Sequence, residues 1–309
     1  MLYIGENDMK HETVLLEEAI KYLNIKPEGI YVDGTLGGAG HSKLILKHLD
    51  KDGFLYAFDQ DDYAIDYAKE VLKDFSNFKI IKSNFKFIKE KLAHENVFGI
   101  DGLLLDLGLS SFQIDDEKRG FTYLKDTSLD MRMNQSQELT AQMILNTYSF
   151  EELSRIFFVY GEEKNSFKIA HRIIDHRPLK TTMDLVKITD SVNYKEKGHS
   201  AKRVFQALRI AVNDELTVLE EVLKEAVDLL NPDGRLVVIT FHSLEDRIVK
   251  HFFKDESETF TPKNMPILVE DTSKLEVLTR KPVYPSDDEY QRNSRSKSAK
   301  LRAARKKQV

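Results

Sequence analysis

Size and composition restrict the chain to a few classes of protein. It has 309 residues, 41% hydrophobic and 31% charged, with a net charge of −5, which is ordinary for a globular protein and excludes wholesale disorder. The absence of cysteine excludes disulfides, thiolate nucleophiles and cysteine zinc sites. No apolar run approaches the roughly 20 residues that span a bilayer, and the N-terminus has no apolar signal-peptide core. We expect a cytoplasmic protein with no membrane association, large enough for one α/β domain and a smaller second domain.

Short β-rich runs alternate with helical patterns in the first third of the chain. The helical pattern between the first two runs places Leu44, Ile45 and Leu49 on one face. This alternation predicts an α/β fold with a parallel sheet. The runs are GIYVD at 29–33, GFLYAFD at 53–59, NFKIIKS at 77–83 and GIDGLLLDLG at 99–108.

The next clear strand, GRLVVITF at 234–241, begins far later than a right-handed crossover requires. Helical patterns fill the interval. Ser149 and Glu152 form a capping box before a helix that we expect to end at Gly161. Further helices are predicted from Ser166 towards Pro178, after Thr182 and at 200–212. We therefore predict an inserted helical domain at 114–212, flanked by 1–113 and 213–309, which together form the sheet domain.

The last part of the chain gives weaker signals. We expect a turn at 231–234 before the strand, and an edge strand at KPVYP, residues 281–285. The tail at 291–309 carries eight Lys and Arg residues and no acid, and a helix is one option for it. Such a segment either contacts nucleic acid or is a solvated tail.

A glycine-rich turn follows the first predicted strand. In GTLGGAGHS, residues 34–42, four glycines permit positive φ and close approach of the backbone to a ligand. The pattern differs from the G-x-G-x-x-G of dinucleotide enzymes. Asp59 ends the second strand, where a carboxylate can accept both hydroxyls of a ribose, and Asp61 can assist. These features favour S-adenosylmethionine over NAD, although such a turn is often purely structural.

Two further polar segments follow predicted strands. Asp106 begins DLGLSS at the end of the fourth strand, where parallel sheets place ligands and reacting groups. Its alternative role is a helix cap. In FHSLEDR, His242 and Asp246 fit loop and helix-capping roles, and we expect no metal site.

Several longer stretches resemble the RsmH (MraW) family of bacterial 16S rRNA cytosine-N4 methyltransferases over almost the entire chain. The stretches are HETVLLEE, DGTLGGAGHS, DGLLLDLGLSSFQID, RGFTY, LDMRM, YGEEKNS, RVFQALRIAVNDEL, FHSLEDRIVKHF and NSRSKSAKLR. The family usually has Pro at the positions of Phe112 and Ser294, and it has HPATR where this chain has HSAKR at 199–203. These differences make the predicted loop conformations less definite.

The resemblance implies a Rossmann-like class I S-adenosylmethionine methyltransferase sheet with an inserted, small, all-helical substrate-recognition domain. The implied cofactor contacts are Ala39, Gly40, His41, Asp59, Phe85, Asp106 and Gln113. The implied partner is 16S rRNA in the small ribosomal subunit or its late precursor, methylated at N4 of a decoding-site (P-site) cytidine. The oligomeric state stays open, with a homodimer among the options.

Methyl transfer from a sulfonium is an in-line displacement, so alignment of the nucleophile matters more than acid-base strength. The N4 of cytosine is a poor nucleophile because its lone pair is delocalised into the ring, and acceptors for its N–H groups would help to localise that pair. We expect Asp106 to line the pocket, with Asp130 as a second acceptor for the amine or as the ion-pair partner of Arg132. Three aromatic residues, Phe112, Phe121 and Tyr123, either stack on the extruded cytosine or pack beneath a loop. Arg119, Arg132, Arg203, Arg209 and the tail are candidate phosphate contacts.

Other functions remain open at this point. The glycine pattern disfavours a nicotinamide-dependent oxidoreductase. A non-catalytic ribosome-assembly factor would keep the basic tail but would not need the cofactor residues. A methyltransferase acting on DNA or a protein side chain would keep the whole cofactor site, and only the family resemblance separates it from an rRNA enzyme.

Overall fold

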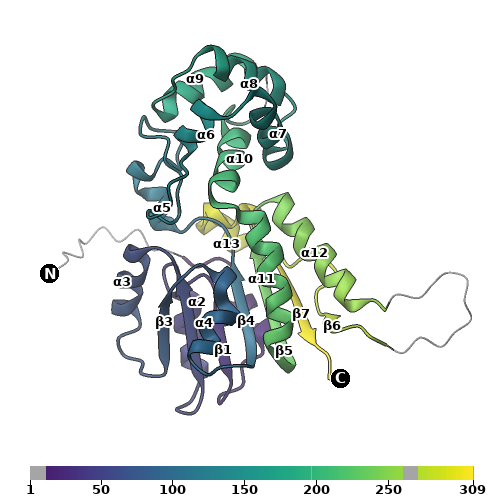
Figure 1. Cartoon of the computed structure of the whole chain (residues 1–309). Coiled ribbons are helices and arrows are strands. Elements are labelled where there is room, and N and C mark those ends of the chain that lie inside the picture. The colour runs from purple at the N-terminus through teal and green to yellow at the C-terminus, as the bar shows by residue number, and fades with distance from the viewer. Residues whose placement is uncertain (1–11, 196, 260–270, 309) are drawn as a thin grey trace, which may run out of the picture. The chain divides into compact units, whose positions relative to one another are not determined.

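The computed structural model describes residues 12–195, 197–259 and 271–308 (Figure 1). The chain forms two compact units, a larger one of residues 1–108 and 218–309 and a smaller one of residues 109–217. The sequence predicts the domain limits at 113/114 and 212/213, a few residues inside those of the smaller unit. Within the described part, no helix is both long and apolar enough to cross a membrane. His11, in the first family-like stretch, and Val309, at the end of the basic tail, lie outside the described residues.

The larger unit contains a seven-stranded sheet with the order β3-β2-β1-β4-β5-β7-β6. Strands β1 to β5 are parallel, and β7 and β6 run antiparallel to their neighbours. The five predicted strands are therefore present, in a mixed sheet. The bounds are β1 Ile30–Asp33, β2 Phe54–Asp59, β3 Phe78–Lys82, β4 Ile100–Asp106, β5 Leu230–Thr240, β6 Leu275–Val277 and β7 Lys300–Lys306.

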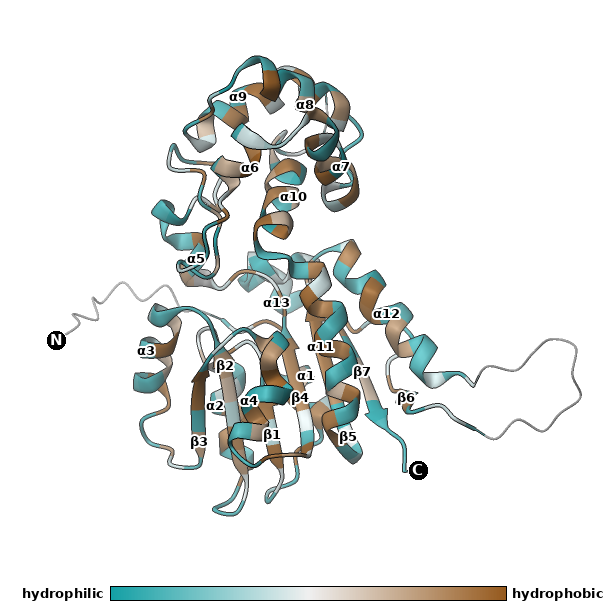
Figure 2. Cartoon of the chain, viewed as in Figure 1, coloured by the Kyte–Doolittle hydropathy of each residue, from teal (hydrophilic) through white to brown (hydrophobic). Residues whose placement is uncertain are grey.

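Two apolar cores, one on each face of the sheet, hold the larger unit together. In β4, Leu103 and Leu105 contribute to one core and Leu104 to the other, so this strand is buried on both faces and reads as an apolar run (Figure 2). One core includes residues of α1 Leu16–Leu23, α2 Gly40–His48 and α3 Asp62–Val71. The other includes residues of α4 Ile88–His94, α11 Glu215–Leu229 and α12 Ser243–Ser257. The remaining elements of this unit are η1 Phe85–Phe87, α13 Asp287–Arg292 and η3 Ser294–Ser298.

The basic tail differs from the prediction. Its residues 300–306 form β7, which lies between β5 and β6 in the sheet. Arg302 is only 5% exposed, and its Nε donates a 2.6 Å hydrogen bond to Asp246. This buried ion pair lets an arginine occupy an inward position, so the segment lacks the apolar alternation of a strand. Part of the tail is thus a sheet element and not a helix.

Two other predictions near the end of the chain were wrong. The KPVYP segment is not a strand, because its described structure is an isolated bridge between Val283 and Leu301. The expected turn at 231–234 belongs to β5, which begins at Leu230. The register slips there, so that these residues form an irregularity in the ladder, with Asp233 at a φ of 66°.

The smaller unit is built from short helices around its own core. The predicted capping box of Ser149 and Glu152 starts α7. Gly161 does not cap this helix, because Glu162 takes the left-handed position. A Cβ at Gly161 would lie 2.6 Å from the carbonyl oxygen of Arg203, so glycine allows α7 and α10 to approach. The bounds are α5 Ser111–Asp115, η2 Glu117–Arg119, α6 Ala141–Thr147, α7 Phe150–Gly161, α8 Ser166–Asp175, α9 Thr182–Asn193 and α10 Lys202–Asn213.

Candidate functional site

The glycine-rich turn between β1 and α2 is held in a strained backbone conformation. Gly37 has a φ of 45°, and Ala39, which has a Cβ, has a φ of 60°. Gly34 lies so close to β4 that a Cβ there would be 2.5 Å from Cδ2 of Leu105. Non-glycine residues in the left-handed region are concentrated at functional sites. This turn is therefore a candidate ligand-binding loop at the carboxyl end of the parallel strands.

Asp59, the last residue of β2, stabilises the glycine-rich turn through a hydrogen bond. Its Oδ2 accepts a 2.9 Å hydrogen bond from the backbone N–H of Gly37, and its Oδ1 accepts one of 2.9 Å from that of Asp61. Burial raises the pKa of Asp59 to about 6, although these two hydrogen bonds favour the ionised form. Each carboxylate oxygen keeps further acceptor capacity. Asp61 itself caps α3 by accepting from the backbone N–H of Tyr63 at 3.0 Å.

A third acid, Asp33 at the end of β1, was not selected from the sequence. It is completely buried, and its Oδ2 accepts a 2.7 Å hydrogen bond from Oγ of Ser42. Its Oδ1 accepts from the backbone N–H of Thr35 at 3.0 Å. Burial raises the pKa of Asp33. The signal was available, because this aspartate directly precedes the glycine-rich turn.

Thr35 links the turn to Asp106. Its Oγ1 accepts a 2.7 Å hydrogen bond from the backbone N–H of Asp106, the last residue of β4. The carboxyl group of Asp106 is 23% exposed, and its Oδ2 lies 3.6 Å from Nδ1 of His41. Its Oδ1 is buried and has no hydrogen-bond partner among the described residues. Burial, followed by repulsion from Asp33 and Glu245, raises the pKa of Asp106 well above its usual range.

The remaining predicted cofactor contacts divide between the two units. Ala39 and His41 are buried at the start of α2, at 0% and 4% exposure. Gly40 faces Thr13, whose Oγ1 would lie 1.8 Å from a Cβ at that position. Phe85, the first residue of η1, has its Cβ 3.4 Å from the place a Cβ of Gly34 would occupy. Gln113 belongs to the smaller unit, where it completes the capping box of α5.

Asp130 is fully engaged by Arg132. Its Oδ1 accepts from Nε of Arg132 at 2.8 Å, and its Oδ2 accepts from Nη2 at 2.8 Å. Burial raises the pKa of Asp130, but the hydrogen bonds from Arg132 outweigh it, and the pKa lies below its usual value. Nη1 of Arg132 donates to the carbonyl oxygens of Gln135 and Gln137 at 3.0 and 2.6 Å. This geometry favours the ion-pair alternative over a role in accepting an amine.

The other predicted RNA contacts in the smaller unit are largely used for structure. Arg119 donates to the carbonyl oxygens of Arg132 and Met133 at 3.0 and 2.9 Å. Arg209 forms a bidentate pair with Glu215 at 2.9 and 2.8 Å. Phe121 lies in the core at 9% exposure, and Tyr123 packs edge-on against Phe205 with ring centroids 5.5 Å apart.

Phe112 and Arg203 are half-buried, as Arg119, Tyr123, Arg132 and Arg209 are. Phe112 lies in α5 and Arg203 in α10. The structure therefore favours packing over stacking for Phe121 and Tyr123. It leaves the roles of Phe112 and Arg203 in RNA binding as predictions.

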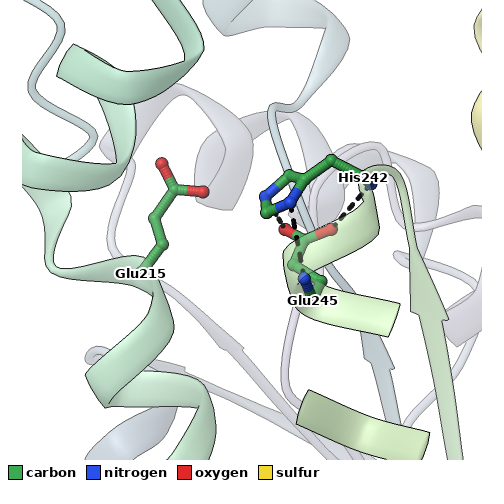
Figure 3. A group of neighbouring side chains, drawn as sticks. All are labelled: Glu215, His242 and Glu245. Atoms are coloured by element: carbon green, nitrogen blue, oxygen red, sulfur yellow. Dashed lines mark hydrogen bonds and ion pairs between the residues drawn. The ribbon is translucent and has the colours of Figure 1, made fainter. Parts of the chain in front are cut away.

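His242 and Glu245 form the capping box that begins α12 (Figure 3). Oε2 of Glu245 accepts from the backbone N–H groups of Phe241 and His242 at 2.8 and 3.2 Å. Asp246 pairs with Arg302 and Lys300. The capping role predicted for this segment is therefore present. Glu215, also drawn in Figure 3, belongs to the smaller unit and pairs with Arg209 there.

The larger unit thus gathers three acids at the ends of neighbouring parallel strands, beside a strained glycine-rich turn. Asp59 offers a carboxylate of the kind that accepts ribose hydroxyls. Asp106 offers a buried oxygen that no described residue uses. Buried polar atoms are normally hydrogen-bonded, so this oxygen, at the end of a parallel strand, is open to a donor from a ligand or a reacting group. The arrangement fits a nucleoside cofactor next to a group that donates a hydrogen bond.

Comparisons with known proteins place the chain in a family. Ribosomal RNA small subunit methyltransferase H 1 of Acholeplasma laidlawii is 61% identical over 298 residues, covering 96% of this chain and 99% of the relative. Ribosomal RNA small subunit methyltransferase H of Onion yellows phytoplasma is 54% identical, covering 97% and 99%. The crystal structure of an rRNA methylase from Streptococcus thermophilus matches 96% of this chain and 99% of that one, with 13% identity and a TM-score of 0.43. A model of the MraW methylase family matches residues 8–307, and the chain belongs to that family.

Proposed function

We propose that this methylase transfers a methyl group from S-adenosylmethionine to the exocyclic N4 of a decoding-site cytidine in 16S rRNA of the small ribosomal subunit. The relatives named as small subunit rRNA methyltransferases support RNA as the acceptor. The observation that carries the proposal is the unused, buried Oδ1 of Asp106 at the end of β4. An amine N–H is a donor of the kind that this oxygen lacks.

The residues of the glycine-rich turn and Asp59 suit the nucleoside part of the cofactor. The carboxylate of Asp59 accepts hydrogen bonds from the ribose hydroxyls, and its own bonds to Gly37 and Asp61 fix its orientation. Phe85 adds an apolar surface beside the turn, which suits the adenine. S-adenosylmethionine, when bound, supplies a methyl group activated by a sulfonium centre.

Asp106 acts on the acceptor amine. Its Oδ1 accepts a hydrogen bond from one N4–H of the cytidine, which orients the amine and helps to localise the nitrogen lone pair. The raised pKa of Asp106 also makes its carboxylate a better proton acceptor than an exposed aspartate. Thr35 positions Asp106 by accepting a hydrogen bond from its backbone N–H, and Asp33 in turn holds Thr35 by accepting from the backbone N–H of Thr35. The smaller unit serves substrate recognition in this proposal.

The test uses purified protein, radiolabelled S-adenosylmethionine and small ribosomal subunits that lack their native methylations. Digestion of the RNA should yield labelled N4-methylcytidine. Asp106→Ala should remove the label even at cofactor concentrations that calorimetry shows to saturate the variant. Asp59→Ala should weaken cofactor binding itself.

Other outcomes would point elsewhere. Label on a different nucleoside would keep the methylase and refute N4 of cytidine. Label on DNA or on protein, and not on rRNA, would refute the acceptor. Tight RNA binding with no transfer from bound cofactor would favour a non-catalytic assembly factor.

A further inference from the structure

A groove runs between α8 and α9 of the smaller unit, away from every residue assigned above. It consists of two adjoining hollows with volumes of about 490 and 270 Å³. Arg172 and Ser191 line both hollows, which makes them one continuous surface feature. Phe167 and Tyr194 line the larger hollow, and Lys187 lines the smaller one.

One end of this groove exposes aromatic rings. Phe167 is 65% exposed and Tyr194 is 73% exposed. The ring of Phe150 supports Phe167 from one side, with centroids 5.8 Å apart and planes inclined at 57°. Nζ of Lys195 lies 5.3 Å from the centroid of the Tyr194 ring. Exposed aromatic rings next to cations are the surfaces on which unpaired bases stack.

The charge of the groove is predominantly positive. Lys168 and Arg172 project from α8 and Lys187 from α9, and all three are exposed. Over residues 12–195, 197–259 and 271–308, none of the three forms an ion pair within 4.0 Å. Asp184, the one acid among the described residues that line the groove, accepts hydrogen bonds from the backbone N–H groups of Lys180 and Thr181 at 3.0 and 3.1 Å. These bonds and the nearby Lys187 lower its pKa.

We propose that this groove binds a single-stranded segment of the small subunit's RNA, with bases on Phe167 and Tyr194 and phosphates on Lys168, Arg172 and Lys187. The inference rests on the proposed function, which supplies the RNA. Three exposed cations facing one carboxylate suit a polyanion, and exposed rings suit bases of any sequence. An acidic protein segment would use the cations but would leave both rings without a planar partner.

The test compares two double variants with matched chemistry. Phe167→Ala with Arg172→Ala alters the groove. Phe158→Ala with Arg155→Ala removes the same two residue types from exposed positions on α7, where Phe158 is 62% exposed and neither residue lines the groove. All four side chains are exposed, so both variants should fold, which circular dichroism and thermal unfolding verify.

Binding is measured by fluorescence anisotropy with labelled protein-free 16S rRNA, and again with small subunits lacking their native methylations. The groove variant should weaken both affinities by about tenfold or more, because a stacked base and a phosphate contact are lost together. Arg172→Ala alone should reduce the slope of log affinity against log salt by about 0.7, the value for one phosphate contact on a single strand. The control variant should bind as the wild type does.

Two binding results would overturn the proposal. Equal binding by the groove and control variants would overturn the proposal. Weaker binding to the assembled subunit alone, with unchanged binding to protein-free RNA, would assign the groove to a ribosomal protein and would also overturn it. Methylation assays on the same variants should show a higher KM for the subunit at unchanged kcat. If the wild type methylates no rRNA, the proposed function fails, while the binding comparison still decides whether the groove holds RNA.

Discussion

Replacing Asp59 by Asn removes the ionisation of this residue, and the pH dependence of stability isolates that effect from the loss of a hydrogen bond. Burial raises the pKa of Asp59 to about 6, from an ordinary value of 3.8. The folded protein therefore holds this proton more tightly than the unfolded chain does. As pH rises from about 4 through about 6, ionisation of Asp59 lowers the free energy of unfolding.

The size of this effect follows from the difference between the two pKa values. Above about pH 7, Asp59 is ionised in both the folded and the unfolded protein. The difference of about 2 between its two pKa values then lowers the free energy of unfolding by about 3 kcal/mol. At pH 4 the same group lowers the free energy of unfolding by only about 0.5 kcal/mol. Asn cannot ionise, so this pH-dependent loss disappears in the variant. Asn can accept from only one of the N–H groups of Gly37 and Asp61 on its oxygen, and that loss is independent of pH.

Urea unfolding of wild type and Asp59→Asn between pH 4 and pH 8 measures the effect. The stability of the variant relative to the wild type should rise by about 2 kcal/mol over this range, whatever the constant offset from the lost hydrogen bond. Cofactor affinity should be lower in the variant above about pH 6, where Asp59 is ionised and Asn replaces a carboxylate acceptor. A stability difference that stays flat with pH would refute the assignment of a raised pKa to Asp59.

Three further changes test other parts of the structure. Asp106→Asn should lower kcat for small-subunit methylation about 100-fold or more; unchanged turnover would remove Asp106 from the mechanism. The same variant should raise the free energy of unfolding as pH increases, because Asn cannot ionise, whereas burial, followed by repulsion from Asp33 and Glu245, disfavours the ionised form of Asp106. Gly161→Ala should lower the free energy of unfolding in urea by about 1–3 kcal/mol, because the new Cβ would lie 2.6 Å from the carbonyl oxygen of Arg203. A more stable variant would contradict this, since the better helix propensity of Ala could prevail only if α7 and α10 were free to separate. The side chain of Arg302 is 6% exposed, and Asp246→Ala removes the carboxylate that pairs with it. This variant should lower the free energy of unfolding, measured by thermal unfolding, by about 3–5 kcal/mol. A loss near zero would show that β7 does not depend on this ion pair.

The parallel strands could be predicted because their residues are buried on both faces. Leu103, Leu104 and Leu105 divide between two cores, so β4 appears in the sequence as an uninterrupted apolar run. Asp59 and Asp106 could be selected for a related reason, since each ends such a run. Asp33 also ends a buried strand and directly precedes the glycine-rich turn, so the same rule applies to it.

Features that depend on distant partners could not be predicted. The inward position of Arg302 in β7 depends on Asp246, 56 residues earlier in the chain. Gly161 is typical of a helix end, yet its role depends on the backbone of Arg203 in α10. The sequence kept two roles open for Asp130, and only the geometry of both of its oxygens favours the pair with Arg132. Local patterns carry no information about such contacts.

The placement of the smaller unit between two hydrogen-bonded strands affects the order in which the chain can fold as it is synthesised. β4 pairs with β5, but residues 109–217 are made between them. When β4 has left the ribosome, the edge that pairs with β5 has no partner until more than a hundred further residues have been added. The smaller unit is contiguous, and its helices α7 and α8 pack on each other locally, so it can acquire its core while the sheet is still incomplete. A slow translation step just after residue 217 would therefore prolong the exposure of an apolar strand edge, whereas the same delay before residue 100 would not.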